Sequence, residues 1–127
     1  MAQSLDQVLI FDISRIMELK DSITRLTALA HEGRLLAFRE IVKAERPGVS
    51  AGDLARKLGV QPNTLSAQLN ILSASNLIAG TRHGRSIIYR ADLSALNDLV
   101  LYLIEDCCDG RDEVCAPILD AIQSVNC

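Results

Sequence analysis

The apolar positions between residues 50 and 75 repeat at helical spacing and predict a helix-turn-helix. Leu54 and Leu58 lie four residues apart, which places both side chains on the buried side of a short helix. Ser50 and Asp53 stand at its start as a capping box, in which each side chain can satisfy a backbone N–H group. Gly59 tolerates the left-handed conformation of a tight turn, so we expect the helix to end there.

A second helix is predicted directly after this turn. Pro62 suits the first helical position, where its missing N–H costs nothing, and leucines at positions 65, 69 and 72 form the stripe that faces the core. The opposite face and its flanks carry side chains that can hydrogen-bond to base edges and phosphates. With the residue before the helix and two arginines that follow it, the candidate DNA contacts are Gln61, Asn63, Thr64, Ser66, Gln68, Asn70, Arg82 and Arg85.

A β-hairpin is predicted over about 78–90. Two β-prone runs, 77–82 and 85–90, flank His83 and Gly84, and the glycine supplies the positive φ that a hairpin turn requires. The hairpin carries several arginines, so it would form a basic wing beside the helix pair.

Helices are predicted on both sides of this central unit. Before it, Ser4 can cap a helix with a broad apolar stripe up to Leu19, and two more helices follow over 22–30 and 32–44. After it, an amphipathic helix over 91–108 starts at Asp92 or Ser94, and a last helix covers about 114–125. The fold class is therefore mainly α with a β-hairpin: one winged helix-turn-helix domain over residues 1–127, with the helix-turn-helix at about 50–75.

The charges are unevenly distributed along the chain, although the formal net charge is only -3. Residues 1–53 contain seven basic and eight acidic residues. Residues 54–91 contain five basic residues and no acidic residue, and residues 92–127 contain one basic and eight acidic residues. The segment without acids is the one expected to approach a polyanion. The sequence shows neither a membrane-spanning apolar run nor a signal-peptide pattern, so we expect a cytoplasmic protein without membrane contact.

Five stretches resemble the winged-helix core of the ArsR/SmtB family of metalloregulatory repressors: 28–35, 54–60, 63–69, 72–78 and 84–90. The resemblance covers well over half the chain. It implies an operator DNA partner and a homodimer built from the N-terminal and C-terminal helices. From periodicity alone, packing of the first helix within its own monomer fits equally well.

The chain departs from this family at Ala67, Gln68 and Asn70, where members commonly carry basic or histidine side chains. Phosphate neutralisation would then depend on Arg56, Lys57, Arg82, Arg85 and Arg90. An alternative stays open: a winged-helix domain that no longer binds DNA and binds another protein instead.

Three cysteines near the C-terminus predict a site for a soft metal or metalloid ion. Cys107 and Cys108 are adjacent, and Cys115 follows a helix stop at Asp109-Gly110, so the three thiols can meet around a turn. Trivalent arsenic and antimony take three sulfur ligands, and thiolates select thiophilic ions. Zinc fits less well, because a structural zinc site needs four ligands, usually from paired C-x-x-C units.

Other interpretations of these cysteines remain. The surrounding carboxylates would also assist cadmium or lead, and ordinary buried cysteines would need no ligand. Cys127, the final residue, is an accessory thiol or has no role. Within the resemblance, the arrangement is similar to the C-terminal cysteine site of some arsenic-responsive members.

These observations together predict a homodimeric repressor that binds operator DNA and releases it when As(III) or Sb(III) occupies Cys107, Cys108 and Cys115. The alternatives are a thiol redox-sensing regulator and a soft-metal-binding or interaction module without DNA contacts. An enzyme is not expected, because neither His31 nor His83 has a neighbouring partner arranged for nucleophilic catalysis. We interpret His31, at a helix junction, as a structural residue.

Overall fold

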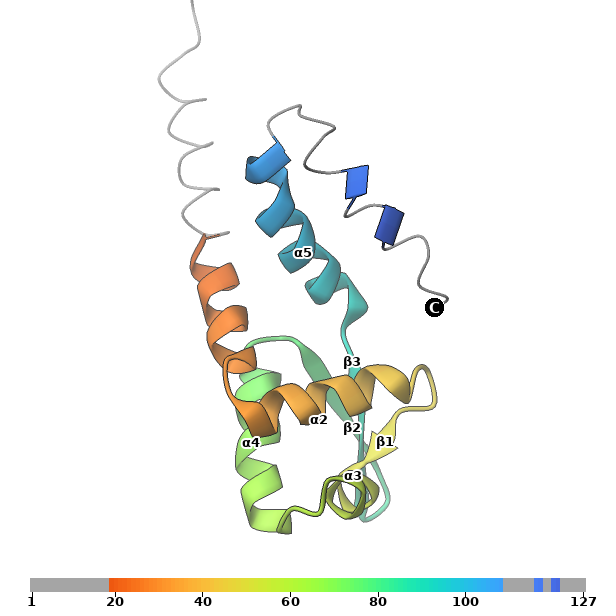
Figure 1. The fold of residues 1–127 in the computed structure, drawn as a ribbon. Coiled ribbons are helices and arrows are strands. Elements are labelled where there is room, and N and C mark those ends of the chain that lie inside the picture. The colour runs from red at the N-terminus through yellow and green to blue at the C-terminus, as the bar shows by residue number, and fades with distance from the viewer. Residues whose placement is uncertain (1–18, 109–115, 118–119, 122–127) are drawn as a thin grey trace, which may run out of the picture.

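The computed structural model describes residues 19–108, 116–117 and 120–121 (Figure 1). Residues 19–29 are helical, and the elements that follow are α2 (Glu32–Lys43), β1 (Val49–Ser50), α3 (Ala51–Leu58), α4 (Pro62–Ala74), β2 (Ile78–His83), β3 (Ser86–Ala91) and α5 (Leu93–Cys108). The predicted fold class, mainly α with a hairpin, is confirmed. None of the helices in this part of the chain has the length and apolarity of a membrane span.

Two predicted helices fall largely outside the described residues. The helix starting at Ser4 lies there except for Leu19, which is helical together with the segment predicted over 22–30. Of the last predicted helix, 114–125, the structure describes 116–117 and 120–121, which are helical.

The sheet has three antiparallel strands in the order β1-β3-β2. The hairpin was predicted, but β1 was not, because two residues are too short to show an alternating pattern. Val49 of β1 pairs with Tyr89 of β3. Gly48, just before β1, has φ 75°, and a Cβ there would lie 2.7 Å from the Tyr89 carbonyl oxygen. Only glycine lets the chain enter the sheet this closely.

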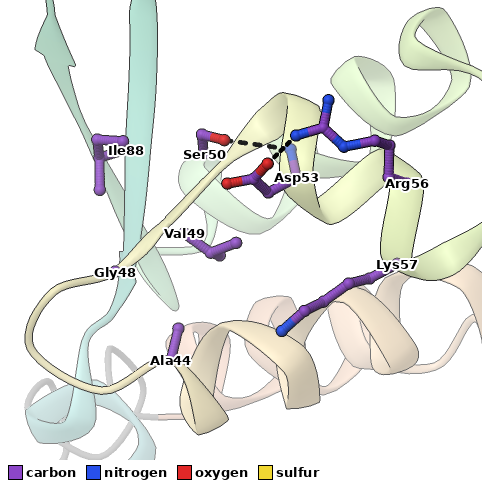
Figure 2. A pocket seen from close by; sticks show the side chains of 8 residues that line it. All are labelled: Ala44, Gly48, Val49, Ser50, Asp53, Arg56, Lys57 and Ile88. Carbon is purple, nitrogen blue, oxygen red and sulfur yellow. Dashed lines mark hydrogen bonds and ion pairs between the residues drawn. The ribbon is translucent and has the colours of Figure 1, made fainter.

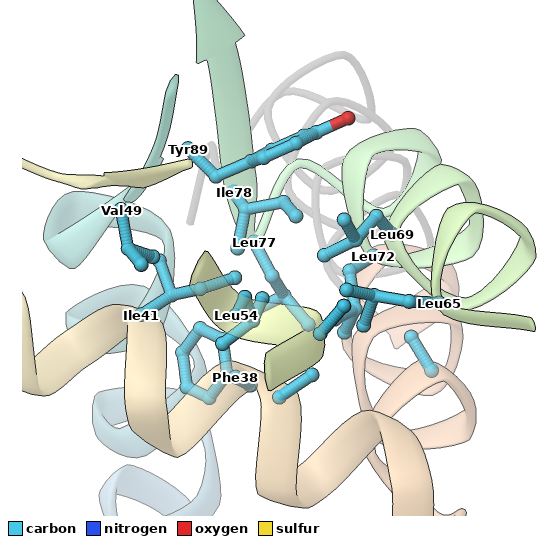
Figure 3. Close-up of a cluster of buried hydrophobic side chains, with 13 residues drawn as sticks. Phe38, Ile41, Val49, Leu54, Leu65, Leu69, Leu72, Leu77, Ile78 and Tyr89 are labelled. Atoms are coloured by element: carbon cyan, nitrogen blue, oxygen red, sulfur yellow. The ribbon is translucent and has the colours of Figure 1, made fainter. Parts of the chain in front are cut away.

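The core lies between α2, α3, α4 and the sheet (Figure 3). The predicted leucine stripes pack into it. Leu54, Leu65, Leu69 and Leu72 are each at most 1% exposed, and Leu58 is partly buried against the same cluster. The side chains that join them from other elements are Phe38 and Ile41 of α2, Val49 of β1, Leu77 just before β2, Ile78 at its start, and Tyr89 of β3. The two helices of the helix-turn-helix, α3 and α4, therefore pack against the same hydrophobic core.

Most local signals around the helix-turn-helix act as expected, but the Asp53 carboxylate of the predicted capping box pairs with Arg56 and not with a backbone N–H group. Ser50 caps α3, its Oγ accepting a hydrogen bond from the Asp53 backbone N–H at 3.1 Å. Gly59 ends α3 in the left-handed conformation at φ 64°, and Pro62 is the first residue of α4. Gly84 occupies the hairpin turn with φ 63°. These four residues fix the start of both helices, the end of α3 and the turn of the hairpin through local backbone conformation.

His31 has the structural role that was predicted for it. It is the N-cap of α2, and its Nδ1 accepts a hydrogen bond from the Arg34 backbone N–H at 3.3 Å. Arg34 in turn donates from Nε to the Ala28 carbonyl oxygen at 2.6 Å, near the end of the helical segment 19–29. The pair fixes the corner between two helices.

Candidate nucleic-acid interface

Helix α4 presents a polar face to solvent. Asn63, Thr64, Ser66 and Asn70 are exposed, whereas the leucines between them are buried. Gln61, the N-cap residue, is also exposed, and its side chain makes no capping hydrogen bond. The first turn of α4 contains no acidic residue, so its free N–H groups and the positive end of the helix dipole face outward unopposed. Such a helix end is suited to an anionic partner.

Arg82 lies on the side of the wing that faces the core. It pairs with Ile87 in the β2–β3 register, and Gly80, two residues earlier, pairs with Tyr89. Paired residues, and residues two apart, share one face of a sheet. Because Tyr89 packs into the core cluster with Leu69 of α4 (Figure 3), Arg82 projects on the α4 side of the hairpin.

Arg85 stands in the turn of the wing and is exposed. With Arg82 it supplies the exposed positive charge of the wing. The structure therefore places two exposed arginines on the wing, of which Arg82 shares the side of the hairpin on which α4 packs.

Two other basic residues expected to neutralise phosphates are engaged by other groups of the protein at its surface. Arg90 is half-buried on the opposite face of the hairpin, and its Nε donates to the Arg46 carbonyl oxygen at 2.6 Å. Arg56 forms an ion pair with Asp53. In the described part of the chain, no hydrogen bond or ion pair engages the side chains of Lys57, Arg82 or Arg85. These three remain available to phosphates.

Gln68 is placed differently from the other candidate contacts. It is half-buried, and its carboxamide packs against Gly33 in the first turn of α2. Gln68 lies at the edge of the leucine stripe of α4. Whether a residue at this edge is buried or exposed depends on where α2 packs against α4. The expectation that Gln68 points at DNA is therefore not met in this structure, in which the side chain faces α2.

A hollow of about 520 Å³ lies between α2, β1 and α3 (Figure 2). Of its polar lining, Ser50 caps α3 and Asp53 pairs with Arg56, whereas the Lys57 side chain forms no hydrogen bond or ion pair with the residues that the structure describes. Lys57 extends its amine across the opening toward α2. The opening has mixed charge, and its Ser50, Asp53 and Arg56 side chains are engaged at α3, so we do not assign the DNA interface to it.

The predicted ion site lies at the edge of the described residues. Cys107 and Cys108 are the last two residues of α5, whereas Cys115 and Cys127 fall outside the described residues. Within the described parts of the chain, no three His, Cys, Asp or Glu side chains gather into a metal site. The three-cysteine site therefore stays a prediction from the sequence.

The core of the fold matches a known family model, described as a helix-turn-helix domain, over residues 29–81. Among curated proteins, the chain is 36% identical over 64 residues to the HTH-type transcriptional regulator NmtR of Mycobacterium tuberculosis. The match covers 50% of this chain and 51% of NmtR, so it spans about half the length of that relative.

Two solved structures extend the likeness beyond the helix-turn-helix. An ArsR-like transcriptional regulator from Rhodococcus sp. RHA1 superposes with a TM-score of 0.62 at 28% identity, over 84% of this chain and 97% of that one. The antimony-specific transcriptional repressor AntR superposes with a TM-score of 0.52 at 30% identity, over 67% of this chain and 78% of that one. These similarities point to a regulator and not to an enzyme. The chain belongs to the ArsR family of transcriptional regulators.

Proposed function

We propose that this protein is a transcriptional repressor that binds operator DNA as a homodimer and releases it when a thiophilic ion binds near the end of α5. The observation that carries the DNA part is the exposed polar face of α4 beside the uncompensated arginines of the wing. In the proposed complex, α4 enters the major groove and the wing neutralises phosphates.

The side chains that we assign to the DNA surface are exposed and of two chemical kinds. Amide and hydroxyl groups on α4 can read base edges or bind phosphate oxygens, while Arg82 and Arg85 contribute charge without sequence information. The α4 set is Gln61, Asn63, Thr64, Ser66 and Asn70. Gln68 is left out of this set because it faces α2.

The proposed dimer rests on two helices with exposed apolar side chains. In the helical segment 19–29, Ile23 is 53% exposed, and in α5, Leu101 is 56% exposed. The two helices lie on the same side of the molecule, beyond the core (Figure 1). Exposed apolar stripes of this kind mark interaction surfaces, and a two-fold axis through them would present two copies of α4 to one duplex. Half-sites one helical turn apart, roughly 34–36 Å, require such a pair.

The proposed inducer is trivalent arsenic or antimony, bound by the thiolates of Cys107, Cys108 and Cys115. A set of three sulfur donors without histidine fits these ions by donor chemistry. The similarity to AntR, an antimony-specific repressor, supports the same class of ion. Cadmium and lead remain alternatives, since carboxylates flank the cysteines in the sequence.

The base of α5 offers a route from this site to α4. The Asp92 backbone N–H donates to the Leu77 carbonyl oxygen at 2.9 Å, and Asp92 Oδ1 accepts from the Ala95 N–H at 3.1 Å. Leu77 lies in the core cluster with Leu72 of α4. A change in the direction of α5 is therefore expected to shift the recognition helices relative to one another, which is the differential effect that release requires.

A gel-shift experiment on the DNA upstream of the gene tests this proposal. The protein should retard that DNA as a dimer, and arsenite or antimonite should abolish the shift. Parallel lanes with cadmium or lead test whether one of these ions is the inducer instead. A lane with peroxide tests whether the protein is a thiol redox switch. A protein that binds random DNA equally well, or that never releases the upstream DNA with any of these ions, would contradict the proposal.

A further inference from the structure

Gln68 is the member of the expected DNA-facing set that the structure turns toward another helix. Its carboxamide lies over Gly33, in the first turn of α2. A Cβ at position 33 would overlap Gln68 Nε2 and lie 3.0 Å from Gln68 Cδ. The missing side chain of Gly33 is therefore what allows the carboxamide to reach α2.

This contact is one of shape, not of hydrogen bonding. Gln68 Oε1 is buried and has no hydrogen-bond partner among the residues that the structure describes. A buried oxygen without a partner is unfavourable, so polar attraction to α2 does not explain the arrangement. The carboxamide instead fills the space above Gly33, where α2 and α4 are in contact.

We propose that Gln68 is a positioning residue, whose packing against Gly33 sets the rotation of α4 about its own axis relative to α2. The inference rests on the proposed function, because it assigns Gln68 a part in sequence-specific binding by α4. Leu65 and Leu72, on the adjacent turns of α4, hold the helix to the core, and Gln68 limits its roll at the edge of that stripe.

The roll of α4 matters for specificity more than for overall affinity. All exposed side chains of α4 turn together with the helix, and hydrogen bonds to base edges depend steeply on direction. Contacts from wing arginines to phosphates are less directional and supply most non-specific affinity. Loss of the Gln68 contact should therefore lower the affinity for operator DNA more than the affinity for random DNA.

The test compares the ratio of operator to random DNA affinity in the full-length variants Gln68→Met and Gly33→Ala. Methionine keeps the length and unbranched shape of glutamine without its amide. If Gln68 acts through packing, Gln68→Met should change the affinity ratio by less than about twofold. About twofold is the smallest effect that coupling between residues in contact usually produces. A direct base contact predicts instead that the ratio collapses in Gln68→Met.

Gly33→Ala should lower the same ratio by more than about twofold, because the new Cβ displaces the carboxamide. Its unfolding midpoint should not fall, since alanine is favoured over glycine inside a helix and the displaced atoms are the flexible end of a side chain. A specificity loss without a stability loss separates positioning from a general weakening of the fold.

The single variant Gln68→Ala and the double variant Gly33→Ala/Gln68→Ala complete a double-mutant cycle with Gly33→Ala and the wild type. In the Gln68→Ala background, Gly33→Ala should have no further effect on the ratio, because no carboxamide remains to be displaced. Independent, multiplying effects of the two changes, or a collapsed ratio in Gln68→Met, would overturn the inference while leaving the proposed function intact. A wild-type protein that does not prefer its upstream DNA would overturn both.

Discussion

Arg25 Nη1 donates a hydrogen bond to the Ala95 carbonyl oxygen at 3.1 Å and so ties the helical segment 19–29 to the first turn of α5. The bond joins residues 70 positions apart in the sequence and is partly buried. Both helices carry the exposed apolar side chains of the proposed dimer surface. Arg25 is therefore placed to keep these helices in one arrangement during the proposed response of α5 to an ion.

Replacing Arg25 by methionine should weaken the coupling between inducer and DNA. The variant loses the guanidinium donor but keeps an unbranched side chain, and we expect about 1 kcal/mol of lost stability, as for a typical intramolecular hydrogen bond. Operator binding should persist, while a higher arsenite concentration should be needed for release. Lys20→Met, on an exposed position of the same helix, is the matched control. Equal arsenite midpoints for the two variants would exclude a role for the Arg25 bond.

Gly48→Ala should destabilise the protein strongly, whereas Gly52→Ala should not. Position 48 has φ 75°, and its Cβ would press on the Tyr89 carbonyl, so we expect a loss of more than about 1 kcal/mol. Position 52 lies in α3 with nothing within 4 Å of a Cβ, so alanine there should be neutral or stabilise by about 0.4–1 kcal/mol. Urea unfolding of both variants measures the difference. Similar midpoints would show that the entry of β1 into the sheet is less constrained than described.

The salt dependence of DNA binding should distinguish the arginines of the wing. Arg85→Ala should reduce the slope of log K against log salt concentration by about 0.9 for a lost phosphate contact, and Arg82→Ala should do the same. Arg90→Ala should leave the slope unchanged, because its guanidinium donates to the Arg46 carbonyl on the other face of the hairpin. Should Arg90→Ala give the larger change, the assignment of the two faces would be reversed.

A charge on the apolar surface of α5 should separate the proposed dimer. Leu101→Glu places a carboxylate on a side chain that is 56% exposed in the single chain, so it should leave the monomer folded while disfavouring association. Ile87→Glu, on the wing, is the control that should remain dimeric. Sedimentation equilibrium gives the mass of each variant. A Leu101→Glu protein with the mass of the wild-type assembly would place the dimer surface elsewhere.

Much of the fold could be predicted because local signals and the apolar period agree around the helix-turn-helix. Ser50, Gly59, Pro62 and Gly84 each act through their own backbone conformation, so their roles are readable without knowledge of the fold. The two-residue strand β1 could not be predicted, because its pairing with Tyr89 depends on a long-range contact and on Gly48.

The candidate site was predictable only in part, for a related reason. The leucine stripe of α4 determines which side is buried, but it leaves the bordering residue Gln68 undecided until α2 is placed. Arg90 likewise looks available in the sequence, yet strand alternation and the carbonyl of Arg46 take it to the opposite face of the wing. The sequence does contain one indication of the Gln68 contact, which is the glycine at position 33. Gly33 leaves room on α2 for a side chain from another helix.

Removing single thiols should abolish the response to arsenite without affecting DNA binding. Cys107→Ser, Cys108→Ser and Cys115→Ser each leave two sulfur ligands for an ion that takes three, so each protein should keep repressing but stop responding. Cys127→Ser should behave as the wild type, since it lies outside the proposed set. Operator affinity without arsenite serves as the check that every variant is folded.

The most direct measurement is an arsenite titration of the preformed complex between the dimer and fluorescently labelled upstream DNA, followed by anisotropy, for wild type, Cys115→Ser and Cys127→Ser. We expect arsenite to lower the anisotropy of the wild-type and Cys127→Ser complexes at the same concentration, through a coupling of about 1–3 kcal/mol. The Cys115→Ser complex should keep its anisotropy throughout. Release of DNA from Cys115→Ser at the wild-type arsenite concentration would contradict the three-thiolate mechanism.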